Sequence, residues 1–248
     1  MLIETNALVL KSFPYSDTSL LTRLYTEQQG KVTILAKGAR RAKNNIVALL
    51  EPLNTIDVSY YYKDGRGIQI LKEVSASVLI SGIRENYEKL VLALAVLDIF
   101  DHTSHEHDPN PILFRLATRT IKEMENTVGS GVRLFWFFVL QLMIRTGFKP
   151  NFFHCGKCNK ILETGILDRL SGAICCDRCL KSGDVKLGSV QLNYLRSMNE
   201  CHIEDVDNLT ISDEFSSGIF DFLLSFASFH LEGMGKVKSL KLIHKNQT

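Results

Sequence analysis

The sequence predicts an α+β protein of two parts: a small closed β-barrel over residues 1–80 and a helical domain over residues 81–248, with a four-cysteine zinc module at residues 153–182. Three observations lead to this prediction. The first eighty residues are rich in β-forming residues and short turns, apolar residues recur at helical spacing after Gly82, and two close pairs of cysteines lie between residues 155 and 179. The 248 residues also exceed the usual domain length of about 100 to 200.

Five strands are expected in the barrel. The turn sequence FPYSD separates the first two, and in the third, KVTILAK, apolar residues alternate with Thr33, Leu35 and Lys37. Gln29-Gly30 is the expected second turn, while Asp64-Gly65 and Gly67 should supply the positive-φ positions of the last one. Closing the strands into a barrel removes unpaired edges. The expected strands cover residues 7–13, 20–26, 31–37, 54–62 and 67–74.

The hydrophobic period changes to that of a helix from about Gly82. Apolar residues then recur every three or four positions, which gives each helix one apolar face. The third helix is apolar almost all round and should end at Gly147, since glycine favours the left-handed conformation that follows many helices. The expected helices cover residues 83–97, 111–124, 132–147, 190–198 and 212–231.

The cysteine spacing is typical of a structural zinc site. Two C-x2-C motifs are separated by seventeen residues, which lies within the range for sites with four cysteine ligands. Each motif brings two thiolates to one ion at about 2.3 Å, and two motifs complete a tetrahedron. Four thiolates leave no position for water, so we expect the ion to stabilise the fold and not to catalyse a reaction. The predicted ligands are Cys155, Cys158, Cys176 and Cys179.

Neighbouring residues offer alternatives to this ligand set. Cys175 would fit a C-x3-C motif, but only Cys176 makes both motifs C-x2-C, so Cys175 is expected to be a buried apolar residue. His154 is a reserve ligand, and Cys201 is expected on a helix face. A redox pair is disfavoured because no thioredoxin-like strand and helix surround either motif. Incidental core cysteines remain a further alternative.

A second cluster of potential ligands lies in the sequence DHTSHEHD. Its histidines are not spaced four apart, unlike those of a metalloprotease helix, and nearby prolines indicate a loop. We therefore expect a solvated loop between helices, with an enzyme site as a distant alternative. The residues concerned are Asp101, His102, His105, His107 and Asp108.

A basic segment, KGARRAK, follows the third expected strand. It carries a local charge of +4 and no acid. Basic residues on a barrel loop can bind nucleic-acid phosphates without reading the bases, although a solvated loop is the alternative. The predicted DNA-contacting residues are Lys37, Arg40, Arg41 and Lys43.

Two other features bear on nucleic-acid binding. A second basic run extends from Lys236 to Lys245, after an acidic stretch at residues 200–214. Several aromatic residues of the barrel are candidates for stacking on bases, and strand alternation places Tyr61 on the opposite face from its two tyrosine neighbours. These candidates are Phe13, Tyr15, Tyr25, Tyr60, Tyr61 and Tyr62.

Several classes of protein are disfavoured. The longest apolar segment, LFWFFVLQLMI, is shorter than the about 18 residues of a membrane span, and the N-terminus lacks the pattern of a signal peptide. We therefore expect a cytoplasmic protein that does not contact a membrane. The sequence has no phosphate-binding P-loop, dinucleotide fingerprint or G-x-S-x-G motif, so no feature of it indicates an enzyme.

Together these features resemble the bacterial recombination mediator family RecO. The stretch ALVLKSFPYSDTSLLTRLYTEQQGKVTILAKGARRAKN is similar to the family's N-terminal pattern, although Asn44 follows Lys43 where the family commonly has serine. The segments FFVLQLMIRTGFKPNFFHCGKC, GAICCDRC and VKSLKLI resemble its later motifs, and the second of them also favours Cys176. The N-terminal matches are Tyr15, Asp17, Thr26, Gly30 and Lys37 to Arg41.

The resemblance implies an N-terminal oligonucleotide-binding (OB) fold and a helical C-terminal domain with the zinc module. It also implies a DNA repair protein, not an enzyme, that binds single- and double-stranded DNA and anneals complementary strands. RecR and the C-terminal tail of the single-strand-binding protein (SSB) are implied partners, in loading RecA onto SSB-coated DNA near the nucleoid. The competing hypothesis is a zinc-stapled OB-fold scaffold that binds protein or RNA.

Overall fold

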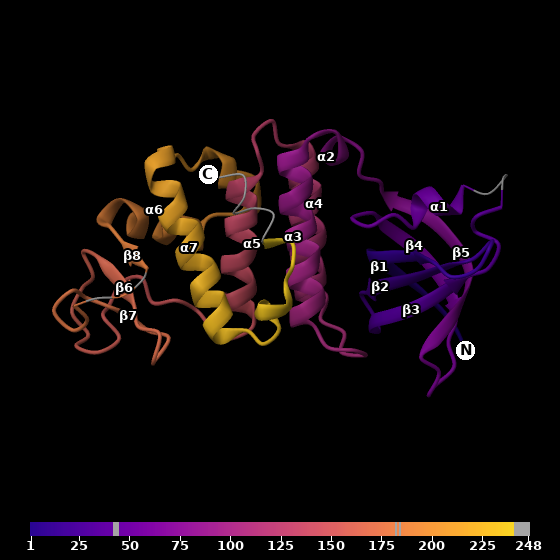
Figure 1. Cartoon of the computed structure of the whole chain (residues 1–248), viewed down its shortest axis with the longest axis horizontal. Coiled ribbons are helices and arrows are strands. Elements are labelled where there is room, and N and C mark those ends of the chain that lie inside the picture. The colour runs from indigo at the N-terminus through magenta and orange to yellow at the C-terminus, as the bar shows by residue number, and fades with distance from the viewer. Residues whose placement is uncertain (42–44, 182, 184, 241–248) are drawn as a thin grey trace. The chain divides into compact units, whose positions relative to one another are not determined.

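The computed structural model of the chain describes residues 1–41, 45–181, 183 and 185–240 (Figure 1). Its internal contacts divide the chain into two compact units. Unit 1 consists of Met1–Asn126 with the described residues from Lys238 onward, and unit 2 consists of Thr127–Val237. The predicted domain boundary near residue 80 coincides with the end of the barrel strands, but unit 1 also includes the helices that follow them.

The barrel in unit 1 has five strands and is closed, as the sequence predicts. The strands are neighbours in the order β1-β2-β3-β5-β4, and β4 pairs with β1 to complete the circle. β3 and β5 pair in parallel, while the other four pairings are antiparallel. The strands are β1 (Leu2–Pro14), β2 (Leu20–Thr26), β3 (Gly30–Ala36), β4 (Thr55–Tyr61) and β5 (Ile68–Val78).

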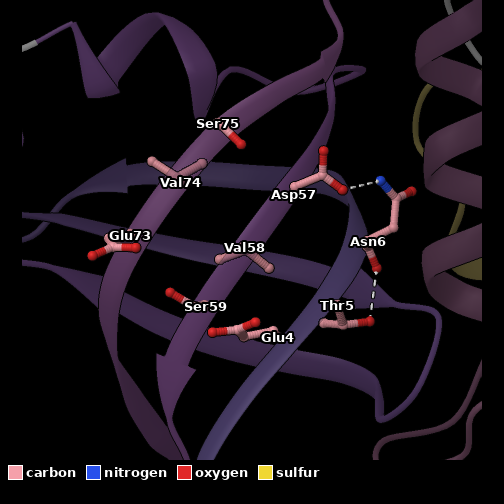
Figure 2. A pocket seen from close by; sticks show the side chains of 9 residues that line it. All are labelled: Glu4, Thr5, Asn6, Asp57, Val58, Ser59, Glu73, Val74 and Ser75. Atoms are coloured by element: carbon pink, nitrogen blue, oxygen red, sulfur yellow. Dashed lines mark hydrogen bonds between the residues drawn. The ribbon is translucent and has the colours of Figure 1, made fainter.

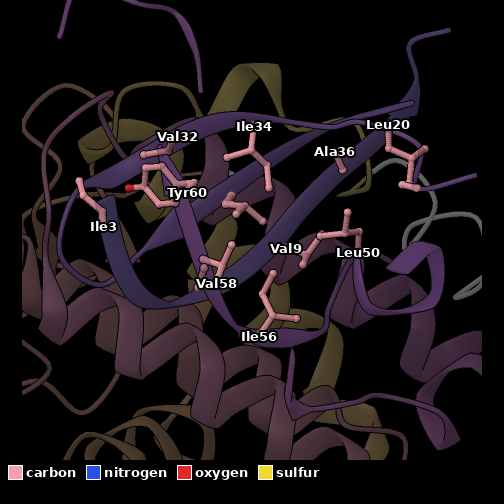
Figure 3. Close-up of a cluster of buried hydrophobic side chains, with 13 residues drawn as sticks. Ile3, Val9, Leu20, Val32, Ile34, Ala36, Leu50, Ile56, Val58 and Tyr60 are labelled. Carbon is pink, nitrogen blue, oxygen red and sulfur yellow. The ribbon is translucent and has the colours of Figure 1, made fainter. Parts of the chain in front are cut away.

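Side chains along the strands alternate between the interior and the outer face of the barrel. On the outside of β1, β4 and β5 the side chains are mostly polar (Figure 2). Inside, aliphatic residues and one tyrosine, Tyr60, fill the barrel (Figure 3). A core of this kind explains the closure, because each buried aliphatic side chain contributes about 1.5–3 kcal/mol. The fully enclosed members include Val9, Leu24, Ile34, Ile56 and Tyr60.

Glycines at two of the predicted turns adopt the left-handed backbone conformation. Gly30, the first residue of β3, has φ +64°, and a Cβ there would lie 2.7 Å from the backbone oxygen of Asp108. Gly65, between β4 and β5, has φ +71°. The prediction for Gly67 is wrong, since its φ is not in the left-handed region. One left-handed glycine is sufficient for this turn.

The structure divides the helix predicted at residues 83–97 into α2 and α3, begins α4 at Pro111 as predicted, and adds the short α1, which was not predicted. Asn86 caps α3, where its side chain accepts a hydrogen bond from the Lys89 backbone N–H at 3.0 Å. Glu125 of α4 accepts hydrogen bonds from the backbone N–H groups of Ser81, Gly82 and Ile83, which lowers the pKa of its carboxyl although burial opposes the shift. The helices are α1 (Ile46–Leu49), α2 (Gly82–Glu85), α3 (Tyr87–Thr103) and α4 (Pro111–Asn126).

Part of the DHTSHEHD sequence is not the solvated loop that we expected. Asp101 and His102 belong to α3, and the Asp101 side chain is only 5% exposed. Its carboxylate meets three cations of the barrel: Lys11 at 2.9 Å, Arg23 at 3.2 Å and Lys31 at 3.3 Å. These four residues, the Asp101 cluster, join α3 to the barrel within unit 1.

The rest of that sequence is a loop that also packs on the barrel. Glu106 pairs with Arg23, and the Tyr25 hydroxyl donates a hydrogen bond to the backbone oxygen of Asp108 at 3.0 Å. His105 and His107 are exposed, as expected for a loop. The prediction failed for Asp101 because the cations that pair with its buried carboxylate come from the barrel strands, far away in the sequence.

The described part of unit 2 contains three longer helices, two short 3-10 helices and a small sheet. Gly147 follows α5 with φ +94°, which confirms the expected helix end. The sheet has the order β7-β6-β8. The elements are α5 (Val132–Arg145), β6 (Gly165–Leu167), β7 (Ile174–Cys175), β8 (Lys186–Leu187), α6 (Ser189–Glu200), η1 (Ile203–Asn208), α7 (Asp213–His230) and η2 (Met234–Lys236).

Helix α5 explains the most apolar segment of the sequence. Ten consecutive residues, Leu134 to Met143, are buried, because α6, α7 and η1 all contact this helix. Among the described residues, no helix combines the length and the apolar character that crossing a membrane requires.

Candidate functional site

The structure brings the four predicted zinc ligands together. The sulfur atoms of Cys155, Cys158, Cys176 and Cys179 all lie within 4.8 Å of one another, and no other such group of potential metal ligands occurs among the described residues. The sulfurs of Cys158 and Cys176 are 3.7 Å apart. Four sulfurs at about 2.3 Å from a zinc ion would be about 3.8 Å apart. The spacing and chemistry of this four-cysteine cluster therefore fit a tetrahedral zinc ion.

Local backbone structure positions each pair of cysteines. In the first motif the Asn159 N–H donates to the Cys155 carbonyl at 2.9 Å, with Asn159 at φ +57°. In the second, the Cys179 N–H donates to the Cys176 carbonyl at 3.1 Å. Gly156 permits the two motifs to approach, since a Cβ there would lie 2.7 Å from the Ala173 side chain. Both motifs are thus tight turns that direct two sulfurs to one point.

Hydrogen bonding sets the protonation of the thiols. Burial opposes ionisation of Cys155, but N–H groups of Cys158, Cys176 and Lys157 lower the pKa of its thiol to about 6. Hydrogen bonding between the thiol groups, chiefly to Cys158, raises the pKa of Cys179 to about 12. The thiols therefore differ in how readily they lose a proton, and a bound cation would favour the thiolate form of all four.

The alternative ligands do not join the cluster. Cys175 is fully buried in β7, where burial raises the pKa of its thiol, in agreement with the expected packing role. His154 is exposed, and Cys201 follows the end of α6. Neither residue belongs to the group of ligands that the structure brings together.

The cysteine module is anchored on the helices of unit 2. Arg196 of α6 donates hydrogen bonds to the carbonyl oxygens of Phe152 at 2.8 Å and Leu162 at 2.9 Å. Its guanidinium also lies 5.0 Å from the centre of the Phe153 ring. Phe152 is buried against Phe222 of α7. The sequence did not reveal these contacts, which fix the module to two helices.

The basic segment lies on the surface of the barrel, after β3. Lys37, Arg40 and Arg41 are exposed, and Lys43 lies outside the described residues. The Arg40 backbone N–H donates to the Thr18 carbonyl at 2.9 Å, and its guanidinium donates to the Ser16 carbonyl at 3.1 Å. These bonds hold the segment against the loop between β1 and β2.

Two exposed aromatic residues flank that same loop. Phe13 at the end of β1 is 54% exposed, and Tyr15 in the loop is 58% exposed. Of the other stacking candidates, Tyr60 is buried inside the barrel and Tyr25 is buried outside it, against Phe100 of α3 and Phe114 of α4, while Tyr61 is 52% exposed. We call the exposed residues Phe13, Tyr15, Lys37, Arg40 and Arg41 the basic-aromatic edge. The sequence placed the basic residues after a strand, but not next to these aromatic residues.

The second basic run is only partly described. Lys236 ends η2, and the backbone N–H groups of Lys238 and Ser239 donate to the carboxylate of Asp98 in α3. Lys241 and Lys245 lie outside the described residues. Contact of this run with DNA stays a prediction.

Comparison with known families and proteins agrees with this architecture. The family described as "Recombination protein O N terminal" matches residues 1–79, and "Recombination protein O C terminal" matches residues 84–241. The two matches correspond to the barrel with its basic segment and to the helical part with the cysteine module.

Curated relatives carry the name "DNA repair protein RecO". One from Salinibacter ruber is 33% identical over 60% of this chain and 57% of its own length. One from Chloroherpeton thalassium is 24% identical over 99% of both chains, and one from Clostridium perfringens is 27% identical over 88% of this chain and 89% of its own. With both family halves matched in order along one chain, the protein belongs to the RecO family.

Proposed function

We propose that the protein is a DNA repair and recombination mediator that binds single- and double-stranded DNA and anneals complementary strands. With RecR it would assist the loading of RecA onto DNA coated by SSB. The observation that carries this proposal is the basic-aromatic edge on the barrel of a RecO-family chain. The role is proposed to be non-catalytic, since it requires binding and alignment of strands and no bond cleavage.

The edge combines the two interactions that bind single strands without reading their sequence. Lys37, Arg40 and Arg41 would contact phosphates and release counterions, which gives affinity that falls with salt. Phe13 and Tyr15 offer faces on which bases stack, each worth about 1–3 kcal/mol. Because Arg40 is hydrogen-bonded to the loop that carries Tyr15, both interactions would act on one strand.

Annealing needs two polyanions held close together. A bound strand whose phosphates are neutralised repels a second strand less strongly, so a basic surface favours pairing. The zinc ion proposed for the four cysteines would supply folding free energy to unit 2. We propose RecR and the C-terminal tail of SSB as the protein partners, because the chain belongs to the RecO family.

A salt series with single-stranded DNA tests the proposal. For the full chain, log affinity should fall linearly with log salt, by roughly 0.7 for each phosphate neutralised. Arg40→Gln with Arg41→Gln should reduce the slope by about 1.4 and weaken all sequences alike. The matched control is Arg66→Gln with Lys122→Gln, which removes the same charge from exposed positions elsewhere in unit 1.

The outcomes separate the two hypotheses for this family member. A salt-independent affinity, or equal losses in both double variants, would contradict DNA binding through the basic-aromatic edge. Annealing of complementary strands in the presence of SSB then tests the mediator role directly. Binding that is confined to RNA or protein would support the scaffold alternative.

A further inference from the structure

A second surface of the barrel has the opposite character from the basic-aromatic edge. The outer face of β1, β4 and β5 carries an open hollow of about 650 Å³ (Figure 2). Two rows of side chains cross it in strand register: Glu4, Ser59 and Glu73 in one row, and Asn6, Asp57 and Ser75 in the next. We call these six residues the acidic face.

The acidic face lies on a different part of the barrel from the basic segment. The half of β1 near the N-terminus pairs with β4 and carries Glu4, whereas the half near Pro14 pairs with β2 and leads to the basic-aromatic edge. None of the described residues that line the hollow is Lys or Arg. Lys72 lies 3.8 Å from Glu73, at the bulge beside it. The carboxylates of Glu4, Asp57 and Glu73 thus have little nearby positive charge to balance them, so this face should repel DNA and attract a cation.

Ser59 is the residue that indicates a built site. It is 7% exposed, and its hydroxyl has no hydrogen-bond partner among the described residues. In register, Ser59 lies between Glu4 and Glu73, so their side chains start about 5 Å away on either side. A buried hydroxyl without a partner is uncommon, and a donor entering between the two carboxylates would satisfy it.

The arrangement suits an N–H cation better than a metal ion. Within the part of the chain that the structure describes, the four cysteines form the only group of three or more potential ligands that could share one ion. The three carboxylates of the acidic face therefore do not lie close enough to share one metal ion, whereas an ammonium or guanidinium has several donors that reach separate acceptors. The closed barrel has no free edge here, so recognition must use side chains.

We propose that the acidic face binds a basic segment of a partner protein. A lysine or arginine side chain of that segment enters between Glu4 and Glu73 and donates a hydrogen bond to the Ser59 hydroxyl. Asp57, held by a 3.0 Å hydrogen bond from Asn6, attracts the next basic residue of the segment. A hollow of about 650 Å³ is large enough for two or three such residues. This inference does not rest on DNA binding.

The test measures binding of a fluorescein-labelled pentalysine amide peptide to the full chain by anisotropy at fixed ionic strength. Glu4→Gln with Glu73→Gln should weaken the peptide about tenfold or more. Ser59→Ala, which changes no charge, should weaken it about threefold. The matched control, Glu85→Gln with Glu88→Gln, removes two exposed carboxylates outside the face and should leave affinity within about twofold.

Three results would overturn the proposal: equal weakening by the control, no change with Ser59→Ala, or displacement of the peptide by equimolar Mg²⁺. Thermal melting checks that each variant folds, and Ser59→Ala carries the test alone if the double variant does not. Single-stranded DNA affinity should not decrease in any of these variants. The DNA-binding test with the Arg40 and Arg41 variants and the peptide test of this site can therefore succeed or fail independently.

Discussion

Each unit of the molecule contains a polar cluster that joins distant elements, and the two clusters differ in what they need. In unit 1 the Asp101 cluster joins α3 to the barrel with charges that the chain itself supplies. In unit 2 the four-cysteine cluster joins two turns through thiols of unequal pKa, and a bound cation would favour the thiolate form of all four. The charges of the first cluster balance within the protein itself, whereas the second would need a bound metal ion to balance its thiolates.

Burial and charge pairing balance differently for the members of the Asp101 cluster. Burial works against the Asp101 charge, but Lys11, Arg23 and Lys31 together lower the pKa of its carboxyl. For Lys31 burial is the stronger influence, so the pKa of its ammonium is lowered despite the attraction of Asp101. Three cations thus stabilise one carboxylate, while the most buried cation depends on that carboxylate to stay charged.

Removing two cysteines should give the largest effect on the molecule. We expect the wild-type chain to bind about one zinc ion, and Cys155→Ser with Cys158→Ser to abolish binding, because two ligands cannot hold the ion against water. Structural zinc supplies about 10–16 kcal/mol in small zinc domains, so the module should lose its fold. Metal content by atomic absorption and amide hydrogen exchange of residues 153–182 measure both results.

Hydrogen exchange in unit 1 is the control for this prediction. The cysteine variant should leave hydrogen exchange in the barrel unchanged, since the barrel belongs to the other compact unit. Zinc retained by the double variant would show that the four cysteines are not the ligand set.

Asp101→Asn should give the next largest effect. The substitution keeps the shape of the side chain but leaves Lys31, which is 5% exposed, without its counter-charge. Breaking a buried ion pair costs about 3–5 kcal/mol, so the denaturation midpoint of unit 1 should fall while metal content stays the same. Glu106→Gln is the control: its carboxylate is 55% exposed, and exposed pairs contribute about 0–1 kcal/mol. Equal losses would show that the Asp101 cluster is a surface interaction.

The two clusters also differ in how far the sequence could predict them. The cysteine ligands lie in two local motifs, so spacing alone indicated the site. Helix periodicity and strand alternation located the barrel strands and the longer helices, but not α1 or the sheet of β6, β7 and β8. Lys11 and Asp101 are 90 residues apart. Neither local propensity nor periodicity records such a pairing, and proline and histidine nearby favoured a loop instead.

The same limit applies to the candidate binding surfaces. Charge content predicted the basic segment, but the exposed Phe13 and Tyr15 beside it depend on how β1 and β3 flank β2. The acidic face was missed for the same reason, because Glu4, Ser59 and Glu73 become neighbours only through strand register. Register between distant strands is set by tertiary packing, which a sequence pattern of period two does not specify.

Lowering the pH should affect the two clusters in sequence. The pKa of the Asp101 carboxyl is lowered by folding, so its contribution is complete above its ordinary pKa of 3.8 and is lost as pH falls through the lower folded value. Thiols ordinarily take up protons near pH 8.5. Protons therefore compete with zinc for the cysteines at a higher pH than that at which Asp101 is protonated. We expect zinc release, followed with a chromogenic chelator, before unit 1 unfolds by near-UV circular dichroism. Unfolding of unit 1 at or above the pH of zinc release would contradict this order.

Cys175→Ser should give the smallest effect and sharpens the assignment within the CCDRC sequence. Cys175 is fully buried in β7 and lies outside the group of four ligands. Its replacement should leave about one zinc ion per chain and cost about 1–3 kcal/mol, because a buried hydroxyl without a partner replaces an apolar thiol. Cys176→Ser is the matched variant, because it makes the same chemical change one position along the chain. It should lower zinc affinity sharply, and the reverse result would move the fourth ligand to Cys175.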